Sequence, residues 1–327
     1  MKLAVIGTSD ISRQFIVGAL EAGFTLAALC SRSAEKGADF LTRCKAGTGK
    51  SGIAETRVFT DIAAMSACPD VDVVYLATPP ALHFEHALAV INAGKHVLVE
   101  KPCFSSVAQV KFAIEAARQK NVFLLETMRL FYSPLTEKLI SALPMIGPVR
   151  YVSLNYMRYS SKYDDYKRGI VHPSFSGEMG GGALSDLCVY AVYLALILFG
   201  KPNRVQYAGV PLICGADGIA TLLLSYPGFN CVINGCKLST AQTPSEIQGE
   251  NGSLLIDNPF MRAGIHFQSN EAKTDKKELF RQDFNDMVTQ QKALHDIIAA
   301  HDTERLSRAH RFMLDSTAIL DQCRAAI

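Results

Sequence analysis

The stretch Val97-Leu98-Val99-Glu100-Lys101-Pro102 joins a short apolar run to an acid, a base and a proline. A run of β-branched and aliphatic residues of this length predicts a buried strand. In an open parallel sheet, ligands bind just beyond the carboxyl ends of the strands. Glu100 and Lys101 are therefore candidates for chemistry at that edge. The alternative is a solvated charged loop, because most charged residues lie at the surface.

The elements that would position this motif alternate strictly between strand and helix over residues 1–125. Such alternation, with strands apolar on both faces, predicts the α/β class and a doubly wound parallel sheet. The expected strands are residues 3–6, 25–30, 57–59, 71–77, 96–99 and 122–125, and the expected helices are residues 11–22, 34–44, 82–93 and 107–120.

The first strand-to-helix turn reads Gly7-Thr8-Ser9-Asp10-Ile11-Ser12, where dinucleotide-binding folds keep G-x-G-x-x-G. Only the first glycine is present. Ser9 and Ser12 are small enough to allow backbone approach to a pyrophosphate and close helix packing, and amides at a helix start attract phosphate. We therefore expect Gly7, Thr8, Ser9, Asp10 and Ile11 to bind a dinucleotide, with an ordinary serine-capped turn as the alternative.

The end of the second expected strand indicates which dinucleotide. An NAD enzyme would place a carboxylate there, but the sequence has Ser31-Arg32-Ser33, with Lys36 nearby. A carboxylate would repel a 2′-phosphate, whereas arginine can grip it with two hydrogen bonds. The segment therefore favours NADP, with NAD possible. The alternative is a surface arginine at the start of a helix.

Ala77-Thr78-Pro79-Pro80 follows the fourth expected strand, and His83 comes one helical turn later. Two prolines fix the backbone there and remove two donors. His83 and His86 have i, i+3 spacing, but H-F-E-H fits no zinc signature and no third ligand is evident. We expect no metal.

Composition limits the class of protein. The 327 residues carry a formal net charge of +2, with 49% hydrophobic and 20% charged residues. This balance favours neither a nucleic-acid nor a membrane partner, and the longest apolar run, Leu187 to Phe199, is shorter than the roughly 18–20 residues of a membrane span. Nine cysteines without a CxxC pair indicate reduced thiols. Because strand-like sequence begins at Lys2, we expect no signal peptide and a cytoplasmic location.

Residues 126–327 lack the strict alternation of strand and helix and instead contain long strand-like segments and hairpin turns. This half predicts an α+β domain with a mostly antiparallel, open sheet. The expected strands are residues 149–159, 203–210, 219–226, 229–238, 245–248 and 253–257, with a helix over residues 135–143 and a helical closing segment over residues 284–327. We therefore expect two domains, residues 1–125 and 126–327.

One helix in the second half combines polar groups with a very apolar surface. It is expected over Ala183 to Phe199, after Gly180–Gly182 as a flexible lead-in and before Gly200. Asp186 and Tyr190 have i, i+4 spacing and therefore share one face. The alternative for Tyr190 is a core tyrosine with a satisfied hydroxyl.

Four motifs occur in a fixed order in the first half: the G-x-x-x-x-x turn, Ser-Arg-Ser, Ala-Thr-Pro-Pro-x-x-His and Ala-Gly-Lys-His-Val-Leu-Val-Glu-Lys-Pro. Together they resemble the motifs of the Gfo/Idh/MocA oxidoreductases. The second half carries that family's other mark, Gly180-Gly181-Gly182-Ala183-Leu184-Ser185-Asp186. The resemblance implies a Rossmann domain that binds NADP or NAD and hydride transfer on a small-molecule substrate, a sugar, polyol or cyclic diol. It also implies a cis Lys101–Pro102 peptide and a homodimer or homotetramer formed through the open C-terminal sheet.

The resemblance further implies roles for single residues. Lys101 would lie beside the nicotinamide, Tyr190 would be the general acid and base, and Asp186 would orient or bind substrate. An ammonium near a tyrosine stabilises its phenolate form. Further expected cofactor contacts are Ala77, Thr78, Pro79, His83 and Glu100, and weaker substrate candidates are Arg129, Tyr159, Lys162 and His172. The competing interpretation is a non-catalytic NADP-binding sensor on the same fold.

Overall fold

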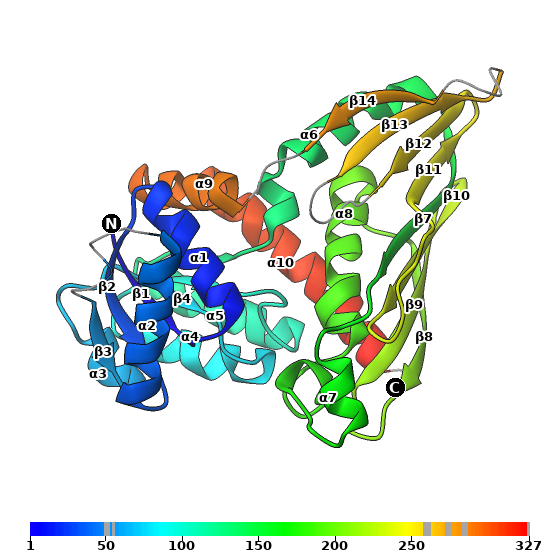
Figure 1. The fold of residues 1–327 in the computed structure, drawn as a ribbon. Coiled ribbons are helices and arrows are strands. Elements are labelled where there is room, and N and C mark those ends of the chain that lie inside the picture. Colours follow the sequence, from blue (N-terminus) through cyan, green and yellow to red (C-terminus); the bar gives the residue numbers. More distant parts are fainter. Residues whose placement is uncertain (49–52, 54–55, 258–262, 272–275, 283–286, 326–327) are drawn as a thin grey trace. The chain divides into compact units, whose positions relative to one another are not determined.

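The computed structural model describes residues 1–48, 53, 56–257, 263–271, 276–282 and 287–325. The chain divides into two compact units. The first comprises Met1–Met128 and Met287–Leu314, and the second comprises Arg129–Asp286 and Asp315–Ile327. Of the expected closing helical segment, residues 284–286 and 326–327 lie outside the described residues. The rest forms α9 (Met287–Ala299) and α10 (Thr303–Arg324) (Figure 1).

The first unit contains a six-stranded parallel sheet of order β3-β2-β1-β4-β5-β6. Its strands are β1 (Lys2–Ile6), β2 (Thr25–Cys30), β3 (Arg57–Phe59), β4 (Val73–Leu76), β5 (His96–Val99) and β6 (Leu124–Glu126). Its helices, besides α9 and part of α10, are α1 (Asp10–Glu21), α2 (Ala34–Thr48), α3 (Ile62–Ser66), α4 (His83–Asn92) and α5 (Val107–Gln119). The order reverses between β1 and β4, which is the topology of a doubly wound dinucleotide-binding fold.

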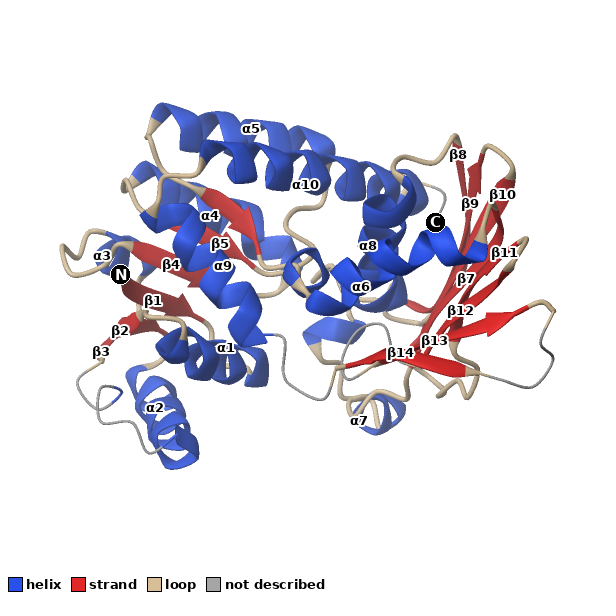
Figure 2. Ribbon diagram, turned by 90° about the horizontal axis from the view of Figure 1, so that it is seen from above, coloured by secondary structure: helices blue, strands red, loops and turns tan. Residues whose placement is uncertain are grey.

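Helices cover both faces of this sheet (Figure 2). Val74 and Leu76 face a core that includes residues of α3, α4 and α5. Tyr75 lies between them on β4 and therefore faces the other side. There its ring stacks on Phe15 of α1 with centroids 3.6 Å apart, and Gln291 of α9 donates a hydrogen bond to the Phe15 carbonyl. Burial on both faces explains why the strands read as continuous apolar runs.

The second unit contains an eight-stranded sheet of order β14-β13-β12-β11-β7-β10-β9-β8, in which only the described pair β10 and β7 is parallel. Its strands are β7 (Val149–Met157), β8 (Arg204–Pro211), β9 (Asp217–Tyr226), β10 (Phe229–Cys236), β11 (Ser245–Gly249), β12 (Gly252–Ile256), β13 (Gly264–Ser269) and β14 (Lys277–Arg281). Its helices include α6 (Pro134–Ala142), α7 (Tyr163–Lys167) and α8 (Val189–Phe199). The predicted fold class is confirmed for both units.

Four of the described α-helices and β-strands were not predicted from the sequence. The short helices α3 and α7 and the strands β13 and β14 carry no strong periodic pattern. β14 lies at the edge of the sheet and bears Lys277, Glu278 and Arg281. Charged residues on an edge strand discourage pairing with another chain, and they also dilute the alternation by which strands are recognised.

Candidate functional site

The carboxyl edge of the six-stranded sheet collects the predicted cofactor residues. Gly7 follows β1, Ser31 follows β2, Ala77 follows β4 and Glu100 follows β5. Parallel strands place all these ends at one edge, and folds of this topology bind their ligands where the strand order reverses, here between β1 and β4. Segments far apart in the sequence therefore meet where a dinucleotide-binding fold places its ligand.

The turn after β1 depends on its single glycine. Gly7 has φ of +113°, and a Cβ at this position would lie 2.8 Å from the Ala77 carbonyl oxygen. Ser9 caps α1 by accepting a hydrogen bond from the Ser12 amide at 3.4 Å, and Ser12 is buried. Two serines thus fit where the fingerprint has glycines, and the amides at the start of α1 stay close to the sheet edge.

Thr8, Ser9, Asp10 and Ile11 remain partly or fully exposed at that helix start. The Asp10 carboxylate turns along its own helix, accepting hydrogen bonds from Gln14 at 2.7 Å and Arg13 at 3.0 Å. These contacts, led by the one from Gln14, lower the pKa of Asp10. The arrangement leaves the backbone amides, rather than a cationic side chain, as the anion-binding groups of this turn.

The segment after β2 presents two cations. Ser33 caps α2 because its hydroxyl accepts a hydrogen bond from the Lys36 amide at 3.2 Å. Ser31 is buried, and its amide donates a hydrogen bond to the Phe59 carbonyl. Arg32 and Lys36 are exposed. Within the part of the chain that the structure describes, Arg32 makes no hydrogen bond or ion pair, so its guanidinium is available to an anion at this edge.

The segment after β4 is tied to the segment after β5 by one imidazole. His83 is completely buried. Its Nε2 lies 2.8 Å from the Thr78 carbonyl oxygen, and its Nδ1 lies 3.1 Å from the carbonyl oxygens of Pro102 and Cys103. His83 therefore braces two edge loops through their backbone, and we propose this supporting part for it in place of direct contact with a cofactor.

The turn after β5 holds Glu100 and Lys101, and the Lys101–Pro102 peptide is cis, as the resemblance implies. Glu100 Oε1 accepts hydrogen bonds from the hydroxyls of Tyr75 at 2.6 Å and Thr127 at 2.8 Å. Its Oε2 accepts from the Lys101 amide at 3.2 Å. The carboxylate thus braces the backbone of the half-buried lysine, and it is itself held by a residue of β4 and by the residue that follows β6.

The sequence did not identify Tyr75, Thr127 or Glu126 as site residues. Glu126 Oε1 accepts a hydrogen bond from the Cys103 amide at 2.8 Å. Tyr75 reads as a core residue inside an apolar strand, and β6 had been expected to end at residue 125. The available signal was positional, since Thr127 follows a strand of the same parallel sheet.

In the second unit, Asp186 lies in a π-helical turn (Leu184–Cys188) that leads directly into α8, which carries Tyr190. Such turns occur frequently at functional sites. Both side chains are half-buried, and the Tyr190 ring meets Tyr156 of β7 edge to face at 5.7 Å. The two residues expected to share a helix therefore do so, across a wider helical turn than predicted.

The glycines before this turn are closely packed, contrary to the expected flexible lead-in. Gly182 has φ of +123°, and a Cβ there would lie 1.9 Å from Asp217 Oδ1. Asp217 is buried, and its Oδ2 accepts a hydrogen bond from the Leu184 amide at 2.8 Å. Burial raises the pKa of this carboxyl. Glycine is required here because a β-strand carboxylate caps the helix start at close range.

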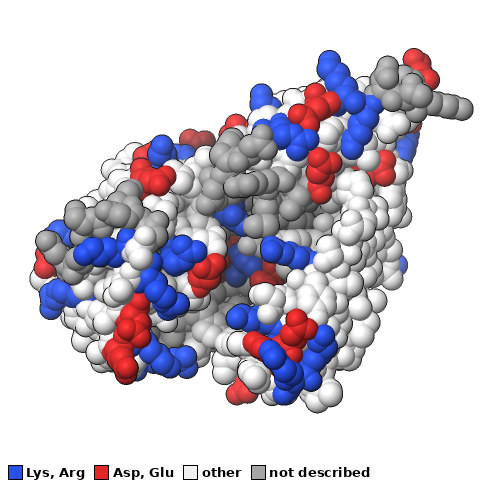
Figure 3. All heavy atoms as spheres, viewed as in Figure 1, with Lys and Arg blue, Asp and Glu red and all other residues white. Residues whose placement is uncertain are grey.

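The weaker substrate candidates separate into two places. Tyr159, Lys162 and His172 lie around α7, whereas half-buried Arg129 begins a short 3-10 helix (Arg129–Tyr132) that packs against α8. Figure 3 shows the mixture of charges over α7. Tyr159 donates to Asp164 at 2.6 Å, and His172 lies 2.7 Å from Asp165. These residues thus serve a local polar network, and their contact with substrate stays a prediction.

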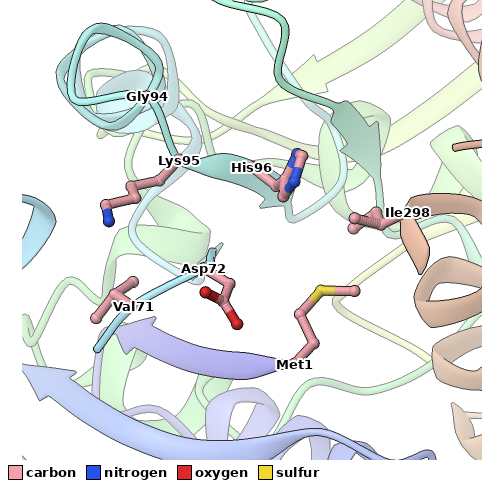
Figure 4. Close-up of a pocket in the computed structure, with 7 residues that line it drawn as sticks. All are labelled: Met1, Val71, Asp72, Gly94, Lys95, His96 and Ile298. Atoms are coloured by element: carbon pink, nitrogen blue, oxygen red, sulfur yellow. The ribbon is translucent and has the colours of Figure 1, made fainter. Parts of the chain in front are cut away.

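A pocket of about 350 Å³ lies at the opposite, amino-terminal edge of the six-stranded sheet (Figure 4). Its polar groups already have partners: Lys95 donates to the Cys68 carbonyl, and His96 Nδ1 accepts from the Phe123 amide. The lining residues are Met1, Val71, Asp72, Gly94, Lys95, His96 and Ile298. This pocket is separate from the strand ends that hold the candidate residues.

The described residues contain no group of three or more His, Cys, Asp or Glu side chains arranged to hold a metal ion. None of their helices is long and apolar enough to cross a membrane.

Comparison with known proteins places this geometry in context. Two family models match: the oxidoreductase family with an NAD-binding Rossmann fold over residues 1–127, and the GFO/IDH/MocA C-terminal domain over residues 144–255. The scyllo-inositol 2-dehydrogenase (NADP(+)) of Bacillus subtilis (strain 168) is 39% identical over 258 residues, which are 79% of this chain and 76% of that protein. The trans-1,2-dihydrobenzene-1,2-diol dehydrogenase of Danio rerio is 31% identical over 192 residues, 58% of this chain and 55% of the relative.

Solved structures share the fold. A 3-ketoreductase from Actinomadura kijaniata in complex with NADP and TDP-benzene superposes with a TM-score of 0.84 at 21% identity, covering 99% of this chain and 97% of that chain. An aldose-aldose oxidoreductase from Caulobacter crescentus complexed with glycerol reaches 0.82 at 21% identity, over 100% of this chain and 97% of the other. At this identity the likeness concerns the fold alone.

Proposed function

The chain belongs to the Gfo/Idh/MocA oxidoreductase family, and from this premise we propose that it is an NADP-preferring dehydrogenase or reductase. Its proposed substrates are sugars, polyols or cyclic diols, which react at a carbon bearing a hydroxyl or carbonyl group. The relative with 39% identity is named for scyllo-inositol and NADP, and a relative with 27% identity is a D-xylose 1-dehydrogenase (NADP(+)) of Hypocrea jecorina.

One observation carries the proposal: the turn after β5 holds Lys101 at the ligand-binding edge of the sheet while Glu100 fixes its backbone. Glu100 takes hydrogen bonds from two neighbouring strands as well as from the Lys101 amide. A solvated loop needs no such bracing. Support from both sides fits a lysine whose position matters for a reaction.

The first unit fits a dinucleotide by the geometry of its own backbone. Gly7 lets the turn after β1 pass close to Ala77, and the exposed start of α1 presents backbone donors to a pyrophosphate. Arg32 and Lys36 would hold a 2′-phosphate. When bound, the nicotinamide would accept or supply the hydride.

Proton transfer is assigned to residues of the chain. In the oxidative direction, the carbon–hydrogen bond breaks with its electron pair as a hydride, and Tyr190 takes the hydroxyl proton as the carbonyl forms. We assign Lys101 the stabilisation of the phenolate and Asp186 the orientation of the substrate. General acid–base catalysis of this kind contributes about 10²–10⁴-fold to a rate.

This assignment is tested by turnover of scyllo-inositol, D-xylose and a trans-dihydrodiol with NADP. We expect Lys101→Met and Tyr190→Phe each to lower kcat at least about 100-fold while NADPH binding stays within twofold. Lys95→Met is the matched control, because Lys95 lies at the opposite edge of the same sheet. A kcat close to wild type in Lys101→Met would overturn the assignment.

Cofactor preference is tested by titration. The chain has no tryptophan, so bound NADPH can be followed by its own emission. Hydrogen bonds between charged groups are worth about 1.5–3 kcal/mol, so Arg32→Ala should weaken NADPH about 10- to 100-fold and leave NADH within twofold. Exposed Arg43 on α2 provides the control Arg43→Ala. Equal weakening of both cofactors would refute the 2′-phosphate contact.

One outcome would favour the competing interpretation. Tight NADPH binding without turnover of any hydroxyl or carbonyl substrate would indicate the non-catalytic sensor.

A second copy of the chain is the proposed partner at the open sheet face, where Leu223 pairs with Val232 and both are half-buried. Sedimentation velocity tests it, since a monomer mass at micromolar concentration would remove this proposal.

A further inference from the structure

Lys237 follows β10 and is one of the few charged side chains buried in the second unit. Only 2% of its side chain is exposed. Its Nζ donates to Asp186 Oδ2 at 2.7 Å and to the Ser174 carbonyl at 2.6 Å, and it lies 4.7 Å from the centre of the Phe175 ring. The ammonium is therefore fixed by a carboxylate, a carbonyl and an aromatic face.

Burial of an ammonium group destabilises the folded chain unless the charge is paired, so the partners of Lys237 indicate its role. Asp186 keeps 39% of its side chain exposed, so the ion pair joins a buried cation to a carboxylate that still reaches solvent. Replacing such a lysine by an apolar residue of similar size would satisfy a purely structural core. The pair therefore holds one oxygen of Asp186 in place while the side chain remains accessible.

The Ser174 and Phe175 contacts extend this restraint beyond Asp186. Phe175 is completely buried and stacks on Tyr163 and Tyr166 of α7, with centroids 6.0 and 5.5 Å apart. Lys237 thereby connects the Asp186 turn to the 3-10 helix Pro173–Phe175 and through it to α7. One side chain sets the relative position of three segments of the second unit.

We propose that Lys237 is a positioning residue that acts through Asp186 by orienting its carboxylate for the substrate. This inference rests on the proposed function, in which Asp186 orients the substrate. Nothing in the sequence pointed to Lys237, because it stands at the end of an apolar strand between Cys236 and Leu238. A surface lysine closing a hairpin would read the same way.

The activity test compares four variants: Lys237→Met, Lys237→Arg, Asp186→Asn and the double variant. We expect Lys237→Met to lower kcat/KM for the polyol about 10- to 100-fold, since misplacement by 1 Å can cost 10²-fold. NADPH affinity should stay within twofold, and Lys237→Arg should recover part of the loss. Since Lys237 acts through Asp186, the double variant should be no slower than Asp186→Asn alone. Losses that multiply would overturn the inference.

Thermal unfolding gives a readout that does not depend on activity. Asp186→Asn leaves a buried ammonium without its carboxylate, so its Tm should fall further than that of the double variant, in which the ammonium is also gone. Additive Tm losses would show that the pair is not coupled, and the inference would fall. If the wild type turns over no polyol, the proposed function fails, whereas this unfolding result still decides whether Lys237 holds Asp186.

Discussion

His83 makes the stability of the first unit depend on pH, and the sign follows from its burial. Burial lowers the pKa of His83 from its ordinary 6.5, although the carbonyls of Thr78, Pro102 and Cys103 and the charge of Glu100 favour the protonated ring. The folded chain therefore binds this proton less readily than the unfolded chain does. As pH falls through 6.5, the unfolded chain takes up more protons at His83 than the folded chain, so the free energy of unfolding decreases.

The size of this effect follows from linkage. With an unfolded pKa of 6.5 and no protonation of the folded form, the contribution of His83 between pH 7 and pH 5 is at most about 2 kcal/mol. His83→Gln removes the titrating group. Although the variant is less stable at pH 7 because it loses packing and hydrogen bonds, its free energy of unfolding should fall less than that of wild type over this range, by up to about 2 kcal/mol.

The assay is urea unfolding followed by far-ultraviolet circular dichroism at pH 7 and pH 5. Exposed His301 has φ of +52°, which asparagine tolerates, so His301→Asn serves as the control. Burial also lowers the pKa values of His86, His96 and His310, and these three residues are common to wild type and His83→Gln, so they cancel in that comparison. In the control, loss of His301 also removes a charge that lowers the pKa of His96. An equal pH-dependent loss in wild type and His83→Gln would refute the reasoning, because the folded and unfolded chains would then bind the His83 proton equally well.

Two further substitutions test the supports of the candidate residues. Gly182→Ala should lower the free energy of unfolding in urea by at least about 2 kcal/mol, because the added Cβ would collide with Asp217 and the backbone has positive φ. The control Gly200→Ala also has positive φ, +75°, but no atom lies within 4 Å of the added Cβ, so it should cost only about 1 kcal/mol. Equal losses in the two variants would contradict this account. Tyr75→Phe should destabilise by about 1.5–3 kcal/mol because Glu100 loses a charged hydrogen bond, and Tyr226→Phe, which loses a neutral one to the Gly200 carbonyl, by about 0.5–1.5 kcal/mol. A smaller loss in Tyr75→Phe than in Tyr226→Phe would show that Glu100 does not depend on that hydroxyl.

Local patterns were sufficient to predict the alternating first half and the points where its strands end. Strands β2, β3 and β5 have the predicted bounds, and for β2 and β5 the reason is that a buried parallel strand is a continuous apolar run between turn residues. The strand ends in turn predicted that Gly7, Ala77 and Glu100 meet at one edge, since parallel strands share that edge. The same reasoning fails for β13 and β14, where pairing with neighbouring strands outweighs a weak local pattern.

The hydrogen-bond partners of the candidate site residues were decided only by tertiary structure. Glu100 is braced by Tyr75 and Thr127, which lie 25 and 27 residues away, and Asp186 is held by Lys237, which lies 51 residues away. No spacing rule links such residues, because whether a charge is buried and what it meets depend on the packing of distant strands. By itself the sequence determined the type of sheet, and it predicted the edge that binds ligand and the acid, base and tyrosine proposed to react. The folded chain alone decided which side chains hold them in place.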